Sequence, residues 1–295
     1  MYKCLSFSRL IYRLIFALLT IAACALFFIA GTAVFSVSAY KSTEKPVPLP
    51  VIMYHSVCGK APSAYTVTPQ QLDSDLAWLK NNGYTSVSAR QLTDYTRGNG
   101  ELPEKPVLIT FDDGFYNNLS LALPLLEKYD MCAVVSIVGR YTDDYAAADP
   151  HADSYSYLTW SDIARLAASG RIEIGSHTYD MHSNSNGRQG CAKLPEESSD
   201  EYAAALGTDI GLLKTELLQN CGIIPEVFAY PFGAISRESL PILRESGILI
   251  TLTCREGINH ITRDPDCLYG IFRYNRSGLL TTEEYMAKLT NETGA

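Results

Sequence analysis

The amino-acid sequence predicts an α/β barrel of parallel strands, preceded by one N-terminal transmembrane helix. From Val51 to the C-terminus, short apolar segments with high β propensity alternate with longer segments of helical periodicity. About eight such units fit into the 255 residues after residue 40, which favours a barrel over an open sheet. The first forty residues differ, because residues 14–40 contain no charged side chain.

The N-terminal segment, residues 1–40, has the length and flanks of a membrane anchor. Lys3, Arg9 and Arg13 precede the apolar run, which places the basic end in the cytoplasm. A cleavable signal peptide is the alternative, since residues 37–39 (VSA) resemble a cleavage site, but the run exceeds the usual apolar region of about 7 to 15 residues. We expect a single-pass protein of the cell membrane with its folded domain outside, or alternatively a protein secreted after signal cleavage.

The chain outside the anchor is acidic. Residues 1–40 carry three basic and no acidic side chains, so the remainder has 21 Lys and Arg against 32 Asp and Glu, a formal net charge of −11. This charge argues against a nucleic-acid partner, which would need a basic face. None of the cysteines forms a C-x-x-C pair, which argues against a thiolate zinc site, and no disulfide is predicted. We expect a monomer.

Two parts follow the anchor: a spacer at residues 41–50, stiffened by three prolines, and one folded domain at residues 51–295. Strands are expected at residues 51–54, 85–88, 107–111, 132–138, 171–176, 227–230, 248–252 and 268–273. Helices are expected at residues 68–82, 89–97, 116–129, 160–169, 201–220, 238–246 and 281–289.

Local signals support the ends of several of these elements. The first helix begins with a capping-box pattern, Thr68 and Gln71, and ends before Gly83. Helix 238–246 ends before Gly247. Residues 183–199, rich in Ser, Asn and Gly, form the one long irregular connection, and we expect them on the rim of an active-site face.

The segment Val107–Gly114 (VLITFDDG) is the centre of the predicted site. Its apolar run ends in Asp112 and Asp113, as a buried parallel strand would deliver two carboxylates to its carboxyl end. Neighbouring side chains on a strand point to opposite faces, so both carboxylates reach one pocket only if the chain turns, which Gly114 permits. Adjacent aspartates repel each other, and a divalent cation would relieve the repulsion.

Three further segments place polar or aromatic residues at the ends of expected strands. His177 and His182 are five residues apart, so they converge only if His177 ends a strand and His182 returns from the following loop. Two hydrogen-bonded histidines are the alternative to two metal ligands. Residues 228–233 (FAYPFG) form an apolar strand and a turn, for which an aromatic-lined loop is the simplest interpretation. His55 ends the first expected strand, and a histidine buried in the core is the alternative to one with a function in the site.

In this order, the segments YH, TFDDG, SHT with a second histidine, and FAYPFG resemble the polysaccharide deacetylase family, the NodB homology domain enzymes of carbohydrate esterase family 4. The resemblance covers roughly residues 51–275. It implies a distorted (β/α) barrel of about seven strands. It also implies a hydrolase that removes N-acetyl groups from the amino sugars of an extracellular glycan: peptidoglycan, poly-N-acetylglucosamine or a chitin-like polymer.

The resemblance also implies roles for individual residues. Asp112 resembles the general base, and Asp113, His177 and His182 resemble the ligands of one divalent cation, zinc first, with cobalt or nickel as alternatives. The N–H of Phe232 resembles the group that helps to hold the oxyanion, and the substrate-binding motif around it comprises Tyr230, Pro231 and Phe232.

Three features depart from the common family pattern. The histidine spacing is five where most members have four, which resembles the branch that acts on poly-N-acetylglucosamine. Ala229 stands where an arginine usually steadies the base, which puts that salt link in doubt. The usual leucine-x-histidine acid is missing near the C-terminus, and His260 is a poor replacement, so the acid role is assigned to His55.

Two arginines end the last expected strand. Arg273 and Arg276 are candidates for contact with the glycan or with Asp112, and surface ion pairs are the simpler expectation.

Two other functional classes were weighed. A glycoside hydrolase needs two carboxylates about 5 to 9 Å apart on either side of the scissile bond, which sequence neighbours cannot easily provide. A catalytically weak, membrane-anchored glycan-binding member of the same family is the alternative to the enzyme. Its support is the missing arginine and terminal histidine, and the intact acidic and histidine motifs count against it.

Overall fold

The structure, a computed structural model, describes residues 11–12, 15–16, 18–23, 25, 45–59, 62–148, 150–185 and 187–293. The chain divides into two compact units, Met1–Lys45 and Pro46–Ala295. Most of the predicted membrane segment lies outside the described residues. Within those residues, no helix combines the length and the hydrophobicity that a bilayer crossing requires. The anchor therefore stays a prediction.

The second unit is built around a parallel sheet. Its strands are β2 (Val51–Tyr54), β5 (Thr85–Ser86), β6 (Pro106–Phe111), β7 (Ala133–Ile137), β8 (Ile172–Ser176), β9 (Val227–Ala229), β10 (Ile250–Leu252), β12 (Tyr269–Ile271) and β13 (Tyr274–Asn275). The order is β12-β10-β9-β8-β7-β6-β2-β13, with β5 paired to β6 beside this path. All pairings in it are parallel, which confirms the predicted winding.

One chain segment supplies both edges of this sheet. β12 pairs with β10 at one edge, β13 pairs with β2 at the other, and the two strands are separated only by Phe272 and Arg273. Counted as one interrupted strand, they give seven strand positions in the described part of the chain. This arrangement is consistent with the expected distorted barrel of about seven strands.

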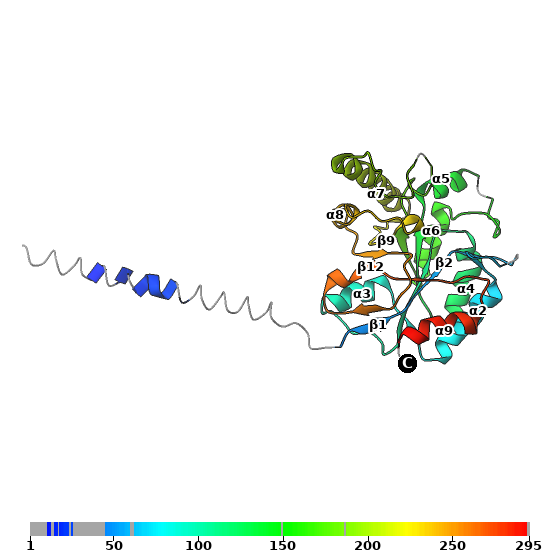
Figure 1. The fold of residues 1–295 in the computed structure, drawn as a ribbon, viewed down its shortest axis with the longest axis horizontal. Helices are drawn as coiled ribbons and strands as arrows, with labels where there is room; N and C mark the ends of the chain where they lie inside the picture. Colours follow the sequence, from blue (N-terminus) through cyan, green and yellow to red (C-terminus); the bar gives the residue numbers. More distant parts are fainter. Residues whose placement is uncertain are drawn as a thin grey trace, which may run out of the picture. The chain divides into compact units, whose positions relative to one another are not determined.

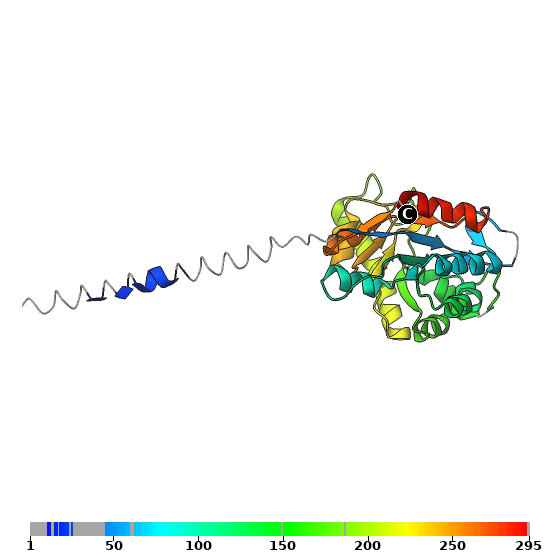
Figure 2. The ribbon, with the colours of Figure 1, turned by 90° about the horizontal axis from the view of Figure 1, so that it is seen from below.

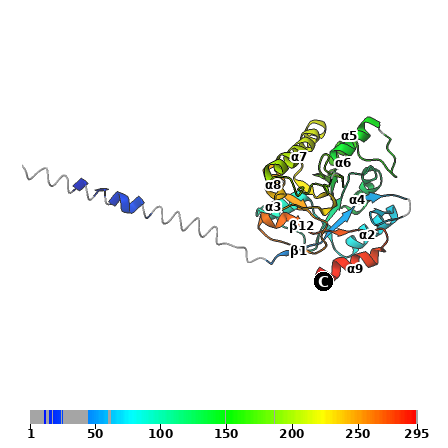
Figure 3. The ribbon, with the colours of Figure 1, turned by 45° about the horizontal axis from the view of Figure 1, so that its top comes forward.

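Helices surround the strands, as Figures 1, 2 and 3 show. They are α2 (Pro69–Asn81), α3 (Ala89–Thr96), α4 (Leu123–Tyr129), α5 (Gly139–Ala148), α6 (Trp160–Ala168), α7 (Ser199–Cys221), α8 (Ser239–Glu245) and α9 (Thr282–Thr293). The predicted capping box of Thr68 and Gln71 is formed at α2. α2 packs against α4 and α9, whereas α7 packs against α6 and α8.

Several elements differ from the sequence-based expectation. The helix expected at residues 116–129 is a π-helical turn, η1 (Asn118–Ala122), followed by α4, because Pro124 has no N–H to continue an α-helical ladder. α5 was not expected, since its run of small and acidic residues lacks a clear apolar period. The strand expected at residues 268–273 begins with a 3₁₀ turn, η3 (Pro265–Leu268), and stops at Ile271.

The folded unit also begins earlier than residue 51. β1 (Val47–Leu49) pairs antiparallel with β11 (Asn259–Ile261), and Leu49 is fully buried. The last part of the expected spacer is therefore part of the fold. Its alternating prolines hide the strand in the sequence, but edge strands tolerate proline.

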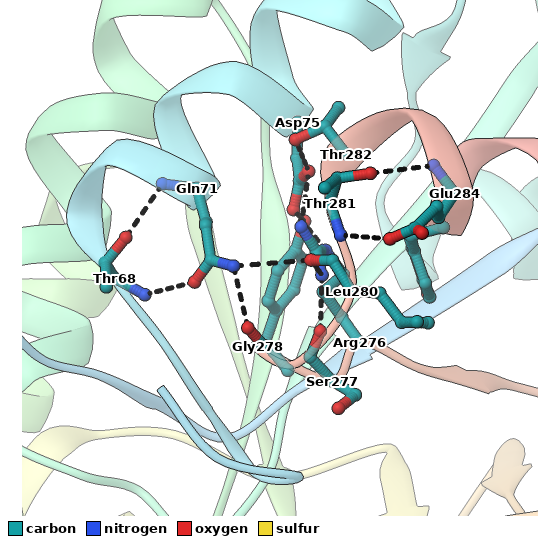
Figure 4. A network of polar contacts seen from close by, with 12 residues as sticks. Thr68, Gln71, Asp75, Arg276, Ser277, Gly278, Leu280, Thr281, Thr282 and Glu284 are labelled. Carbon is teal, nitrogen blue, oxygen red and sulfur yellow. Dashed lines mark hydrogen bonds and ion pairs between the residues drawn. The ribbon is translucent and has the colours of Figure 1, made fainter. Parts of the chain in front are cut away.

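A buried ion pair ties the chain after β13 to α2 and α9 (Figure 4). The Arg276 Nε donates to Asp75 Oδ2 at 2.7 Å, and the Thr282 hydroxyl donates to Asp75 Oδ1 at 2.6 Å. Tyr54 on β2 donates its hydroxyl to the same carboxylate at 2.9 Å. The expectation that Arg276 makes a surface ion pair is wrong, because both Arg276 and Asp75 are buried. Its side chain reaches inward to an acid that the sequence alone does not reveal as buried.

Replacing Asp75 with alanine is expected to lower the free energy of unfolding by about 3–5 kcal/mol, because it leaves the Arg276 charge buried without its partner. Urea unfolding followed by circular dichroism measures the change. Asp73→Ala is the control, since it removes a partly exposed carboxylate from the same helix, where it pairs with Lys128. Equal losses from the two variants would contradict the assigned weight of the buried pair.

Candidate active site

Six of the predicted site residues line one cavity of about 590 Å³: His55, Asp112, Asp113, His177, His182 and Phe232. His55 follows β2, Asp112 and Asp113 follow β6, His177 follows β8, and Phe232 lies in the turn after β9. The carboxyl ends of parallel strands in an α/β barrel are the usual place for an active site. The expected rim segment, residues 183–199, contributes Gln189 to the cavity wall.

The two aspartates reach the cavity because β6 breaks into a turn, as expected. β6 ends at Phe111, and both Asp113 and Gly114 have left-handed backbone conformations, with φ of 72° and 71°. A side chain at position 114 would also collide with β7, since an added Cβ would lie 2.9 Å from Ile137 Cγ2. Glycine is therefore required at 114, both for its conformation and for the close approach.

Asp113, His177 and His182 form a candidate metal centre. Their ligand atoms all lie within 4.8 Å of one another. Asp113 Oδ1 is 3.5 Å from His177 Nε2 and 3.2 Å from His182 Nε2. The structure thus brings together the two histidines, although they are five residues apart. One carboxylate oxygen and two imidazole nitrogens suit Zn²⁺ and similar divalent ions, with positions left for water or substrate.

Hydrogen bonds to the second ring nitrogen orient both imidazoles. His177 Nδ1 lies 2.8 Å from the Ala229 carbonyl oxygen, which requires a proton on Nδ1 and leaves the Nε2 lone pair of the neutral ring available to a metal ion. Burial lowers the pKa of His177, which favours the neutral ring that a metal ligand needs. His182 Nδ1 lies 3.2 Å from the Tyr141 hydroxyl. Tyr141 belongs to α5, a helix that was not expected, so this contact was not predicted.

Asp112 is held by a two-pronged ion pair with Arg273. The Arg273 Nη1 donates to Oδ1 at 2.8 Å, and Nη2 donates to Oδ2 at 2.7 Å. Burial alone would raise the pKa of Asp112, but the charge and the hydrogen bonds of Arg273 outweigh it and hold the pKa well below its ordinary value. Asp112 is therefore an ionised carboxylate in a fixed orientation.

Of the contacts expected for Arg273, the one with Asp112 is confirmed, whereas the substrate contact and the surface ion pair are wrong. Its side chain is fully buried, and its Nε donates to the Thr253 carbonyl oxygen at 2.8 Å. The guanidinium instead fills the role left open by Ala229. Ala229 on β9 is in register with Leu252 on β10, and Leu252 is in register with Ile271 on β12. Arg273 follows Ile271 by two residues, so it lies at the same carboxyl edge of the sheet as Ala229. The signal in the sequence was an arginine at the end of an expected strand, which had indicated Asp112 as one candidate partner.

His55 lines the cavity. Its ring stands edge-on to Tyr65, with 5.0 Å between ring centroids. The His55 Nδ1 is buried, and no hydrogen-bond partner for it exists in the described part of the chain. By contrast, His260 is exposed on β11, paired with Pro48. The acid role of His55 stays a prediction.

The three residues of the FAYPFG turn have different surroundings. Phe232 lines the cavity with φ of 57°, and its ring centroid is 4.6 Å from that of His182. The Tyr230 side chain instead lies in the core, where its hydroxyl is 2.9 Å from Ser239 Oγ. The Tyr230 N–H donates to the Leu252 carbonyl oxygen, and Pro231 has no N–H. Of the three, only Phe232 can offer a backbone donor to a ligand.

The family model named polysaccharide deacetylase matches residues 99–250. The chain belongs to the polysaccharide deacetylase family. This confirms the family predicted from the motifs.

Relatives of this family member include the poly-beta-1,6-N-acetyl-D-glucosamine N-deacetylase of Escherichia coli K12. The two are 27% identical over 238 residues, which cover 73% of this chain and 35% of that protein. The chain is also 30% identical over 220 residues to YxkH of Bacillus subtilis, a polysaccharide deacetylase by name, covering 75% of this chain and 69% of that one. A solved de-N-acetylase from Aggregatibacter actinomycetemcomitans has a TM-score of 0.69 and 28% identity, covering 83% of this chain and 99% of that chain.

The chain spans about a third of the length of the E. coli relative. The similarity to poly-N-acetylglucosamine deacetylases agrees with the branch indicated by the five-residue histidine spacing.

Arg273→Met is expected to lower the free energy of unfolding by about 3–5 kcal/mol, because it strands the Asp112 charge in a buried site. Adding Asp112→Asn removes that charge, so the double variant is expected to recover part of the loss. Arg273→Lys keeps a positive charge but loses the two-pronged hydrogen bonding. Its free energy of unfolding is expected to lie between those of the unaltered protein and Arg273→Met. Chemical unfolding of these variants, of Asp112→Asn alone and of the unaltered protein measures the coupling, and strictly additive losses would argue against the ion pair.

Proposed function

We propose that this family member is a metal-dependent N-deacetylase that removes acetyl groups from the amino sugars of an extracellular polysaccharide, with poly-N-acetylglucosamine as the first candidate. One observation carries the proposal: three metal-ligating side chains share a cavity with an aspartate that an arginine holds ionised. The names of the E. coli relative and of the solved Aggregatibacter structure support the same chemistry.

The donor set of Asp113, His177 and His182 favours zinc, with cobalt and nickel as alternatives. When bound there, the ion would supply Lewis acidity, polarising the acyl carbonyl and lowering the pKa of the attacking water.

The other residues divide the proton transfers of amide hydrolysis between them. Asp112 acts as general base and takes the proton of the attacking water, while the Arg273 fork fixes its orientation. His55 delivers a proton to the leaving amine, and its unpartnered Nδ1 indicates that a polar group of the substrate belongs in the cavity. The Phe232 N–H helps to hold the oxyanion.

Exposed aromatic rings on the cavity wall support a sugar substrate. Tyr65 is 61% exposed and Phe232 is 43% exposed, and both line the cavity. A pyranose ring offers an apolar C–H face that packs well on such rings, while its hydroxyl and amide groups need polar partners. The cavity combines the two kinds of surface.

The alternative of an inactive glycan-binding member loses part of its support. That alternative rested partly on Ala229 in place of the usual arginine, and Arg273 provides a guanidinium at the base from another strand.

The cellular location is proposed from the sequence alone. The uncharged run at residues 14–40 and the basic residues before it support a membrane anchor, with the catalytic domain outside the cell. Separation of cells into membrane and soluble fractions tests this, and a purely soluble chain lacking residues 1–40 would favour the secreted form.

Alanine at Asp113 or His177 is expected to abolish both metal retention and acetate release. Asp112→Asn is expected to reduce the rate of acetate release by a factor of at least ~10² while the metal is retained, because it removes only the base. Metal content is measured by atomic emission, and acetate is measured enzymatically with N-acetylglucosamine oligomers, peptidoglycan and chitin oligomers as substrates. Removal of metal by a chelator is expected to stop the reaction, and added zinc to restore it.

A fully active Asp112→Asn would refute the base assignment. Metal retention without acetate release from any substrate by the unaltered protein would favour the glycan-binding alternative.

Tyr65→Ala is expected to raise KM for N-acetylglucosamine oligomers by about 2- to 12-fold, the equivalent of about 0.5–1.5 kcal/mol for a lost aromatic contact. Tyr65→Phe keeps the ring and is expected to retain KM. Tyr155→Ala is the control, since Tyr155 is 57% exposed but does not line the cavity. Steady-state kinetics measures the three variants, and a KM unchanged by loss of the Tyr65 ring would contradict the stacking role.

A further inference from the structure

The loop between the two ligand histidines has little regular structure of its own. Residues 178–181 connect His177, which is buried at the end of β8, to His182, which faces the cavity. Thr178 has a left-handed backbone with φ of 73°, an uncommon conformation for threonine. The histidine spacing is five residues where most family members have four. The longer loop allows a wider range of distances between the two imidazoles, so contacts from outside the loop must set that distance.

A carboxylate of α7 holds this loop by its backbone. Asp209 Oδ1 accepts the N–H of Tyr179 at 2.7 Å, and Asp209 Oδ2 accepts the N–H of Asp180 at 2.7 Å. Asp209 is only 6% exposed. Both of its oxygens are thus committed to the segment between the two ligands.

The start of α5 holds the opposite side of the same segment. The N–H of Gly139 donates to the Thr178 carbonyl oxygen at 3.1 Å, and the N–H of Arg140 donates to that of Tyr179 at 2.7 Å. The approach is close, because a Cβ added to Gly139 would lie 2.4 Å from Tyr179 Cδ2. The loop is therefore pinned by its carbonyl groups on α5 and by its amide groups on α7.

The position of Asp209 in α7 is costly for a charged residue. The buried stripe of this helix consists of Tyr202, Leu206, Asp209, Ile210, Leu213 and Leu217. Burial raises the pKa of Asp209, and the backbone N–H groups of the loop oppose that rise. The partners of this carboxylate are backbone N–H groups of the loop rather than a cation. So unfavourable a position for a charge in an apolar stripe indicates that the carboxylate serves to hold the loop.

We infer that Asp209 is a positioning residue that sets the separation of His177 and His182, and so the affinity of this site for its divalent ion. The inference rests on the proposed function, since it assumes that the two histidines bind a metal. An asparagine cannot replace the acid, because one of its two positions is an NH₂ group that would face a backbone N–H. Removal of the carboxylate frees the loop without touching either ligand.

The test measures zinc affinity of the whole chain by competition with a chromophoric chelator. Asp209→Asn and Asp209→Ala are expected to bind zinc about 10–100-fold more weakly than the unaltered protein, the usual range for loss of a group that orients metal ligands. The visible spectrum of the cobalt-loaded protein is expected to change in band position or intensity, because the ligand geometry changes. Asp209→Glu, which keeps two acceptor oxygens on a longer arm, is expected to recover part of the affinity.

Asp162→Asn is the matched control. Asp162 is also a buried carboxylate that accepts a backbone N–H, that of Thr159 at the start of α6, and it makes no hydrogen bond to residues 177–182. Thermal unfolding of the metal-free proteins gives the general cost of each change, and Asp162→Asn is expected to lower stability with zinc affinity unchanged.

The inference is wrong if Asp209→Asn loses stability as the control does but keeps the zinc affinity and cobalt spectrum of the unaltered protein. If Asp209→Asn and Asp209→Ala do not fold, Asp209→Glu decides by the same two measurements. An unaltered protein that binds no divalent ion would overturn the proposed function itself and the inference with it. Normal metal binding without acetate release would overturn only the proposed activity.

Discussion

The buried ion pair between Arg273 and Asp112 links the architecture of the sheet to the chemistry of its cavity. Arg273 lies in the two-residue break between β12 and β13, the segment that pairs with both edges of the sheet. Three residues further on, Arg276 forms an ion pair with Asp75 of α2, and the same carboxylate accepts a hydrogen bond from Thr282 of α9 (Figure 4). Both helices are thereby bound to this segment. One short stretch therefore completes the sheet, anchors two helices and orients the carboxylate proposed as the base. Buried guanidinium forks suit this task, because they satisfy both oxygens of a carboxylate and fix its plane.

The loops that build the cavity share a strained backbone. Asp113, Thr178 and Phe232 all have positive φ, and each follows a different strand of the sheet. Such conformations cost about 1–3 kcal/mol each and persist only where surrounding contacts impose them. Here those contacts are identifiable: Ile137 behind Gly114, Asp209 and α5 around residues 178–180, and His182 against Phe232. The cavity is a place where the fold holds the chain away from its local preference so that side chains from separate strands converge.

The sequence predicts the part of this site that short segments encode. The apolar run before Asp112 and Asp113, the strand before His177 and the turn at residues 231–233 each carry a local signal, and parallel winding puts such strand ends at one edge. The partners were harder to predict. Arg273 and Asp112 are 161 residues apart, and their contact was only one option beside a glycan contact and a surface ion pair, because no periodicity shows which charges will be buried together. Asp75 and Asp209 look like ordinary polar positions of exposed helices until packing buries them. β1 and α5 were not predicted for a related reason. The prolines of β1 and the weak amphipathicity of α5 remove the local signal, while tertiary contacts stabilise both elements.

The replacement of the usual arginine shows what the site constrains. The family motif has its arginine at the position where this chain has Ala229, the last residue of β9, yet the guanidinium beside the base comes from the segment after β12. β9, β10 and β12 are successive neighbours in the sheet, so their carboxyl ends are within reach of one point. The chemistry requires a positive, planar donor at the carboxylate and is indifferent to the strand that supplies it. Absence of a motif residue is therefore weak evidence for lost activity in a barrel, because several strand ends can deliver the same group to the same place.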